Sequence, residues 1–340
     1  RSREHYSQWY KRTTDPDIQK KLFGSMRAVG KMCAGLSLQA LRQLLRAASF
    51  HGKMNEEDVI KRVEAYIISQ LGEGVVEFKK PTHTLKDVVG CRRFKAYAKK
   101  ELIPGFKTTD PELALSGAGV AGPIGCGKTF FFEGLAAELG ILVLVLKNIR
   151  SKWFGGTDVI LERLYRVLVS LGKVMILMDE ADTVLGGVGP DVHATERRAT
   201  GKIQGWMSDP ALKGKVTWLL MTARIHRLSP DIRRPGRVGD TIIPMDDPTG
   251  EDHDDGIKFA ISPSIDKMPS KTSDDMKAIK EATKGHSFAA LKALRSKLKR
   301  LSKREKRKLT VEEVVTLIKR QRPANIGTMR EYQTLQGYVN

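Results

Sequence analysis

Cysteine and acidic residues are scarce in this chain, and long hydrophobic runs are absent. Three cysteines occur in 340 residues, at positions 33, 91 and 126. This odd, scattered set excludes a disulfide framework and a cysteine-rich metal site, and it fits a reducing compartment. No hydrophobic run reaches membrane-spanning length, and no signal peptide is visible. We therefore expect a soluble, cytoplasmic protein without a membrane partner.

The shortage of acids leaves a large positive charge. Lys and Arg number 59 against 39 Asp and Glu, which gives a formal net charge of +20. Residues 292–308 concentrate this charge, with Glu305 as their one acid. Such a surplus favours a nucleic-acid partner, whereas a solvated helix face or a docking surface for an acidic neighbour explains the same run. No aromatic residue interrupts the run, so base stacking is not indicated.

One complete phosphate-binding pattern is present. Gly122-Pro123-Ile124-Gly125-Cys126-Gly127-Lys128-Thr129 fits G-x-x-x-x-G-K-[ST] without a mismatch. The glycines let such a loop wrap a triphosphate and aim its N–H groups at the oxygens. Lys128 then reaches the β- and γ-phosphates, and the Thr129 hydroxyl is a ligand for Mg²⁺. A strand-like run before the loop and a helix after it predict a site for ATP or ADP with Mg²⁺, with contacts from Pro123 to Phe130.

A second motif supplies carboxylates downstream of this loop. Residues 174–178 read as an apolar strand that ends in Asp179 and Glu180. A carboxylate at the end of the strand beside a phosphate loop can hold Mg²⁺, which predicts Thr129 and Asp179 as the metal ligands. The next acid can polarise a water for in-line attack on the γ-phosphate, which predicts Glu180 as the general base.

Short apolar strands alternate with helices through the middle of the chain. Strands are predicted near residues 113–121, 141–146, 174–178, 216–221 and 241–243, and a helix over residues 91–103 that breaks at Pro104-Gly105. The alternation is typical of an α/β fold in which helices cover both faces of a parallel sheet. We expect a P-loop NTPase core with a five-stranded parallel sheet, a C-terminal helical lid and an extra helical N-terminal segment.

Two further segments give a family resemblance. Asp179-Glu180-Ala181-Asp182 and Ser229-Pro230-Asp231-Ile232-Arg233-Arg234-Pro235-Gly236-Arg237 are similar to motifs of the AAA family of ATPases, in its protein-remodelling clade. That clade includes valosin-containing-protein-like unfoldases. The resemblance covers roughly residues 80–320. It implies ATP hydrolysis that remodels, unfolds or disassembles proteins through the pore of a homo-oligomeric ring, a hexamer, with a protein substrate or adaptor as partner.

The resemblance also implies positions that surround the nucleotide. Asp87-Val88-Val89-Gly90 resembles the segment that lines the adenine pocket, with Val89 in place of a glycine. His286 matches a position near the adenine or ribose. Arg234 and Arg237 match arginines that reach into a neighbouring subunit's nucleotide, where a guanidinium stabilises charge on the transferring phosphoryl group.

Two other segments concern hydrolysis and substrate handling. Ala223 stands where the family has a sensor asparagine, and the nearest hydroxyl, Thr222, is the substitute candidate. Trp153 and Phe154, followed by two glycines, resemble a pore loop whose aromatic side chains grip an extended polypeptide. Residues 186–195 are Gly-rich and polar, and they are a candidate second pore loop.

An internal similarity suggests the domain boundaries. Residues 35–44 resemble residues 285–294, and each segment is followed by an acidic helix start. We therefore expect residues 1–78 to resemble the small lid domain of a preceding AAA module, whose own core would lie upstream. Residues 79–245 are the expected nucleotide-binding domain, and residues 246–340 the helical lid and C-terminal tail.

Two alternatives stay open from the sequence. The positive charge favours a nucleic-acid-stimulated motor or loader. Ala223 and Val89 favour a scaffold that binds ATP without hydrolysing it.

Overall fold

The computed structural model describes residues 61–340, apart from positions 62–63, 66, 70, 72–74, 80–81, 109, 111, 147–156, 172, 186–193, 240, 321–326 and 340. Most of the N-terminal segment 1–78, including residues 35–44, lies outside the described residues. Among the helices that are described, none has the length and apolar character needed to cross a membrane.

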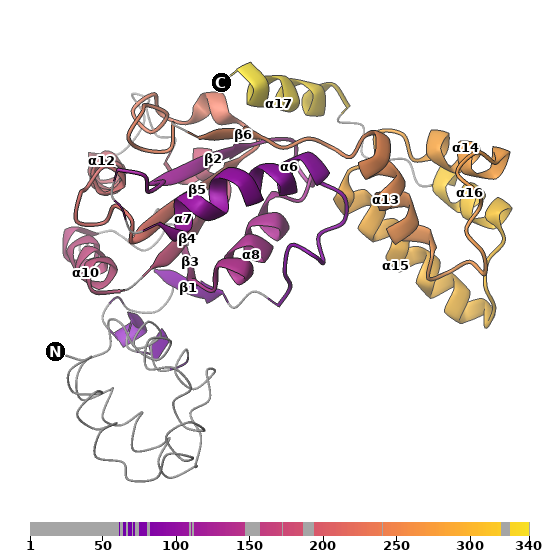
Figure 1. Cartoon of the computed structure of the whole chain (residues 1–340), viewed down its shortest axis with the longest axis horizontal. Coiled ribbons are helices and arrows are strands. Elements are labelled where there is room, and N and C mark those ends of the chain that lie inside the picture. Colours follow the sequence, from indigo (N-terminus) through magenta and orange to yellow (C-terminus); the bar gives the residue numbers. More distant parts are fainter. Residues whose placement is uncertain are drawn as a thin grey trace, which may run out of the picture.

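A six-stranded sheet forms the centre of the molecule (Figure 1). Its strand order is β1-β3-β4-β5-β2-β6. The strands are β1 (Val76–Lys79), β2 (Gly117–Ala121), β3 (Leu142–Leu146), β4 (Val174–Met178), β5 (Val216–Thr222) and β6 (Ile242–Pro244). Strands β2 to β6 are parallel to one another, which confirms the five predicted strands.

Strand β1 corrects the predicted five-stranded, purely parallel sheet. It pairs antiparallel with β3, with Val76 opposite Leu146 and Phe78 opposite Leu144. Its first three residues, Val76 to Phe78, fall within the segment expected to be helical. The alternation of Val76 and Phe78 with charged residues is a strand signal, but it is only four residues long. These residues form a strand rather than a helix because they pair with β3 at the edge of the sheet.

Helices cover both faces of the sheet, as the sequence predicted. One face packs against α6 (Arg92–Tyr97), η1 (Ala98–Leu102), α7 (Ile103–Lys107) and α8 (Lys128–Leu139). The other packs against α10 (Thr157–Ser170) and α12 (Ala194–Met207). Side chains of β4 alternate between the two cores: Met175 and Leu177 join the first, and Ile176 and Met178 the second. This two-sided burial explains why β4 is apolar at every position.

The predicted helix break at Pro104-Gly105 does not occur. Residues 92–107 are helical throughout, with a π-helical turn over Ala98–Leu102 that Ile103 separates from Pro104. Pro104 is the second residue of α7, and the π-helical turn that precedes it changes the hydrogen-bond pattern of the helix there. The helix therefore ends at Lys107.

Four helices form the lid to one side of the sheet (Figure 1). They are α13 (Gly250–Ile261), α14 (Asp274–Ala282), α15 (Phe288–Glu305) and α16 (Val311–Arg320), and they share a separate apolar core. Arg92 joins core to lid, because its side chain contacts Glu251 and its Nη2 lies 2.8 Å from Asp255 Oδ2.

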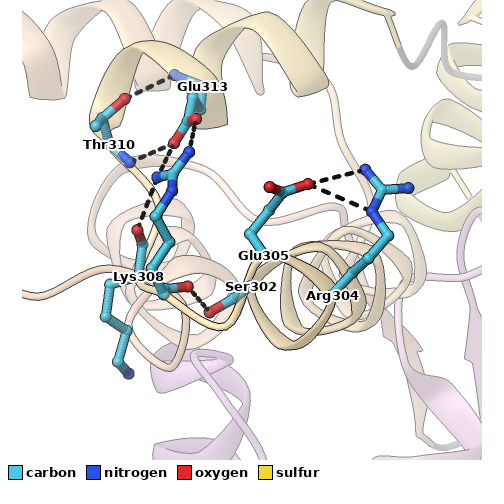
Figure 2. A network of polar contacts seen from close by, with 7 residues as sticks. Ser302, Arg304, Glu305, Lys308, Thr310 and Glu313 are labelled. Atoms are coloured by element: carbon cyan, nitrogen blue, oxygen red, sulfur yellow. Dashed lines mark hydrogen bonds and ion pairs between the residues drawn. The ribbon is translucent and has the colours of Figure 1, made fainter.

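A capping box starts α16, whose first turn carries the acidic residues Glu312 and Glu313. Thr310 N–H donates to Glu313 Oε2 over 2.9 Å, and Glu313 N–H donates to Thr310 Oγ1 over 3.3 Å (Figure 2). Arg307 Nη2 also donates to Glu313 Oε1, at 2.5 Å. These bonds, that of Arg307 above all, lower the pKa of Glu313 to about 2. The basic run thus contains one strongly paired arginine.

The last helix does not join the lid. Helix α17 (Gly327–Val339) returns to the core and lies along β6 and β2 and against the 3₁₀ turn η2 (Ile225–Arg227) (Figure 1). The predicted C-terminal tail is therefore an ordered helix beside the phosphate-binding loop.

Candidate active site

The phosphate-binding loop lies between β2 and α8, as predicted. Two of its glycines are required by close packing. A Cβ on Gly122 would lie 1.9 Å from the carbonyl oxygen of Met245. Gly125 has φ +85°, and a Cβ there would lie 3.2 Å from Ser287 Oγ at the start of the lid helix α15. The loop is therefore tightly held between core and lid.

Lys128 and Thr129 open helix α8 at this loop. Lys128 is buried, and its Nζ donates to the carbonyl oxygens of Gly122 at 2.7 Å and Pro123 at 3.0 Å. Thr129 Oγ1 donates to Asp179 Oδ2 over 2.8 Å. The hydroxyl and carboxylate predicted as metal ligands are thus neighbours, although fifty positions separate them in the chain.

Glu180 follows Asp179 in an unusual backbone conformation. Its φ and ψ are 49° and 43°, in the left-handed region that non-glycine residues rarely occupy. Its N–H donates to Asp179 Oδ1 over 3.0 Å, and its side chain is exposed. Helix α11 (Ala181–Val184) begins directly after it. Such a conformation costs roughly 1–3 kcal/mol and is typical of functional positions.

A cavity of about 830 Å³ joins these groups. Its walls come from the adenine-pocket segment, the phosphate loop, the end of β4, the end of β5, the lid and α17. The predicted residues that line it are Asp87, Val89, Ile124, Gly125, Cys126, Gly127, Lys128, Thr129, Phe130, Asp179, Glu180 and Thr222. At its edge, hydrogen bonds from Thr84 keep the pKa of Asp87 below its ordinary value.

Three predicted contact residues do not line this cavity. The Pro123 carbonyl instead accepts from Lys128. A Cβ on Gly90 would meet Phe288 and Asp252 of the lid, so this glycine permits packing of core against lid. His286 is buried, and no described group hydrogen-bonds its Nδ1. Ser287, its neighbour, caps α15 by accepting from Ala290 N–H over 3.2 Å.

The hydroxyl of Thr222 is already engaged. It donates to Asp182 Oδ1 over 2.5 Å and accepts from Arg224 N–H over 2.8 Å. Asp182 is buried and also pairs with Arg224, whose Nε lies 2.6 Å from Asp182 Oδ2. To replace the sensor asparagine, the Thr222 hydroxyl would have to give up one of these bonds. The guanidinium of Arg224 is a cation next to Ala223 in the chain, and both residues line the cavity.

The two predicted inter-subunit arginines differ in position. Arg234 is exposed, and its guanidinium has no hydrogen bond or ion pair among the described residues. Arg237 is buried, and it donates to Ser208 Oγ at 3.0 Å and to the Asp231 carbonyl at 2.8 Å. Burial lowers the pKa of Arg237. Arg234 is therefore free to reach another molecule, whereas Arg237 is held within its own chain.

Sequence reasoning did not find part of the cavity wall. The residues concerned are Cys91, Asp182, Arg224, His226, Arg227, Met245, Phe259, Phe288, Ala289, Lys292, Met329, Tyr332 and Gln333. Asp182 belongs to the Asp179–Asp182 motif, but its pairing with Arg224 requires the ends of β4 and β5 to lie side by side. Trp153, Phe154 and most of residues 186–195 lie outside the described residues.

The donor set fits Mg²⁺ bound together with a phosphate. Mg²⁺ prefers oxygen ligands and is usually held by one or two protein groups plus phosphate oxygens and waters. Thr129 Oγ1 and Asp179 provide such oxygens at the loop. No group of three or more His, Cys, Asp or Glu side chains suited to a metal occurs in the described part of the chain.

Cys91 and Cys126 lie at this cavity and are both free and buried. Burial raises the pKa of the Cys91 thiol to about 12 and also raises the pKa of Cys126. Because the thiolate is the reactive form, we expect neither to react rapidly with a thiol reagent at pH 8 in a Cys33→Ser variant. Reaction of both after unfolding in guanidinium is the control, and a fast reaction in the native protein would contradict the expectation.

Known proteins resemble this chain over part of its length. Residues 119–244 match the family described as "ATPase family associated with various cellular activities (AAA)". The Cell division cycle protein 48 homolog of Archaeoglobus fulgidus is 27% identical over 175 residues, 51% of this chain and 23% of that protein. The Proteasome-activating nucleotidase of Pyrococcus horikoshii is 27% identical over 202 residues, 56% of this chain and 48% of that protein. The chain thus spans less than half the length of these relatives.

Solved structures show the same fold. The FIGL-1 AAA domain has a TM-score of 0.60 at 19% identity, and the match covers 81% of this chain and 95% of that chain. The FIGL-1 AAA domain in complex with ADP has a TM-score of 0.57 at 18% identity, with 79% and 94% covered.

Proposed function

Because residues 119–244 of this chain belong to the AAA family of ATPases, we propose that the protein hydrolyses Mg-ATP in this cavity and uses the energy to remodel or unfold protein substrates. The observation that carries the proposal is the Thr129–Asp179 contact with Glu180 at its side, in one cavity with the phosphate loop. These groups supply the three functions that γ-phosphate hydrolysis needs: phosphate binding, metal binding and activation of water.

The loop residues bind the phosphates in this proposal. The backbone N–H groups of the loop and the N-terminus of α8 face the β- and γ-phosphates. Lys128 exchanges its bonds to the Gly122 and Pro123 carbonyls for phosphate oxygens. Thr129 and Asp179 would hold Mg²⁺, which would neutralise charge on the phosphates.

Glu180 activates the attacking water. As a carboxylate it accepts a proton from a water placed in line with the bond between the γ-phosphorus and the bridging oxygen, and ADP leaves with that oxygen. The backbone of Glu180 is held by the start of α11 and by the hydrogen bond from its N–H to Asp179 Oδ1. Its side chain therefore starts from a fixed Cα position beside the metal ligands. Arg234 of a neighbouring copy stabilises the charge that develops on the phosphoryl group.

A ring follows from an arginine that acts in a neighbouring copy. A head-to-tail interface in which each copy supplies Arg234 to the next forms a ring when the rotation between copies closes, and an open filament when it does not. We propose a hexamer that threads protein substrates past Trp153 and Phe154. The free Cys91 and Cys126 fit a reducing compartment, and the cytoplasm is the proposed location.

Assembly and turnover test this function together. With Mg-ATP we expect phosphate release whose specific rate rises with protein concentration, and a ring-sized particle in sedimentation velocity.

The predicted pore loop is tested by a substitution. Trp153→Ala is expected to reduce unfolding of a model substrate, while Tyr97→Ala, at an exposed surface aromatic, leaves it unchanged. Absence of ATP and ADP binding in calorimetry would overturn the proposal.

Nucleic-acid stimulation is a second candidate, favoured by the surface of α15. Lys297, Lys299, Arg300 and Lys303 are exposed on this helix and form no ion pair with any described residue. Helical spacing sets these cations on adjacent turns, so they suit a row of phosphates.

A matched pair of variants tests this candidate. Changing these four residues to Gln should abolish salt-dependent DNA binding and any DNA-stimulated ATP turnover. Changing exposed Lys267, Lys271, Lys277 and Lys284 to Gln removes the same charge elsewhere on the lid and should not. Failure of DNA to stimulate the parent protein would leave protein remodelling as the function.

A further inference from the structure

Helix α17 binds both backbone polar groups of one phosphate-loop residue. Ile124 N–H donates to Gln333 Oε1 over 3.3 Å, and Arg330 Nη1 donates to the Ile124 carbonyl. Gln333 is 5% exposed. Ile124 immediately precedes Gly125, so these bonds act on the part of the loop that turns toward the phosphates. Two backbone groups that the loop itself does not pair are thereby satisfied.

Arg330 also bonds the segment that leads to the lid. Its Nε and Nη2 donate to Asp247 Oδ2 over 3.0 and 2.6 Å, between β6 and α13. The two side chains are only 15% and 23% exposed, so the pair is well shielded from water. One guanidinium therefore joins the phosphate loop to the connection between core and lid.

Other contacts seat the helix closely at this place. A Cβ on Gly337 would lie 3.3 Å from the Ala121 Cβ, at the end of β2. The Tyr332 ring packs edge-on against His226, with centroids 5.6 Å apart. Met329, Tyr332 and Gln333 line the cavity itself. Helix α17 is thus a wall of the site as well as a support for its loop.

We propose that α17 is part of the nucleotide site, and that Arg330 and Gln333 are positioning residues that hold the phosphate loop in its nucleotide-binding conformation. The proposal rests on the proposed function, in that it takes the cavity to bind ATP and ADP. It has a thermodynamic consequence: if docking of α17 strengthens nucleotide binding, the nucleotide strengthens docking of α17 by the same factor.

Calorimetry of ADP binding to the full chain is the first test. Arg330→Met and Gln333→Met keep side-chain bulk and remove the polar contacts, and each is expected to raise the Kd for ADP about tenfold. In turnover, KM for ATP should rise with little change in kcat, because the loop binds ground state and transition state alike. Arg330→Lys keeps the charge but cannot reach both acceptors, so it should recover part of the affinity. Leu335→Ala, at an exposed site on α17 outside the cavity wall, is the control and should bind as the parent does.

Hydrogen exchange of α17 in the unmodified protein is the second test, and it needs no substitution that might impair folding. Saturating ADP should slow exchange of the α17 amides. Unchanged exchange, or unchanged Kd in both methionine variants, would overturn the proposal while leaving ATP hydrolysis intact. A parent protein that binds no ADP would instead overturn the proposed function.

Discussion

Replacing Glu180 with glutamine is expected to lower ATP turnover by roughly two to four orders of magnitude. Glutamine keeps the size of the side chain but cannot accept the proton of the attacking water. The substitution leaves the Thr129–Asp179 contact and the phosphate loop unchanged, so the Kd for ADP should stay close to that of the parent. Phosphate release under saturating Mg-ATP, together with calorimetry of ADP binding, measures both quantities.

The control for this variant is Glu101→Gln. Glu101 is a half-exposed surface acid outside the cavity wall, and its Oε1 lies 3.7 Å from Lys100 Nζ. Its replacement should leave turnover as in the parent. If Glu180→Gln hydrolyses ATP as fast as the parent, another group is the base. If the parent itself binds ATP tightly without turnover even in assembled rings, the protein is the non-hydrolysing scaffold that Ala223 favours.

Replacing Arg234 with alanine is expected to lower turnover by about three orders of magnitude or more, without weakening nucleotide binding to the same chain. The guanidinium is exposed and has no polar contact among the described residues, so its loss should not destabilise the fold. Arg237 is the matched comparison. Since its guanidinium bonds Ser208 and Asp231 within the chain, Arg237→Ala should lower the melting temperature.

Mixing two inactive variants shows whether Arg234 acts in a neighbouring copy. An Arg234→Ala chain retains Glu180, and a Glu180→Gln chain retains Arg234. In a random equal mixture about a quarter of the interfaces join an intact cavity to an intact arginine, so activity should reappear. Activity that stays at the level of the separate variants would contradict a shared site.

The sequence located the phosphate loop and its carboxylates because their chemistry depends on residue types at fixed local spacing. The Gly122–Thr129 pattern, the apolar strand before Asp179 and the alternation of strands with helices are all local signals. They were sufficient to predict the parallel sheet and the Thr129–Asp179 pair. Strand β1 was not predicted, because its four residues form a strand only by pairing with β3, which is distant in the sequence.

By itself, then, the sequence determined the α/β class, the five parallel strands and the candidate nucleotide ligands. Only the tertiary structure decided that Arg234 is exposed while Arg237 is buried, that Asp182 engages Thr222 and Arg224, and that α17 closes the cavity through Arg330 and Gln333. The physical reason is that most of these contacts join residues 29 to 209 positions apart. Local propensity and periodicity carry no information about which distant surfaces will pack together.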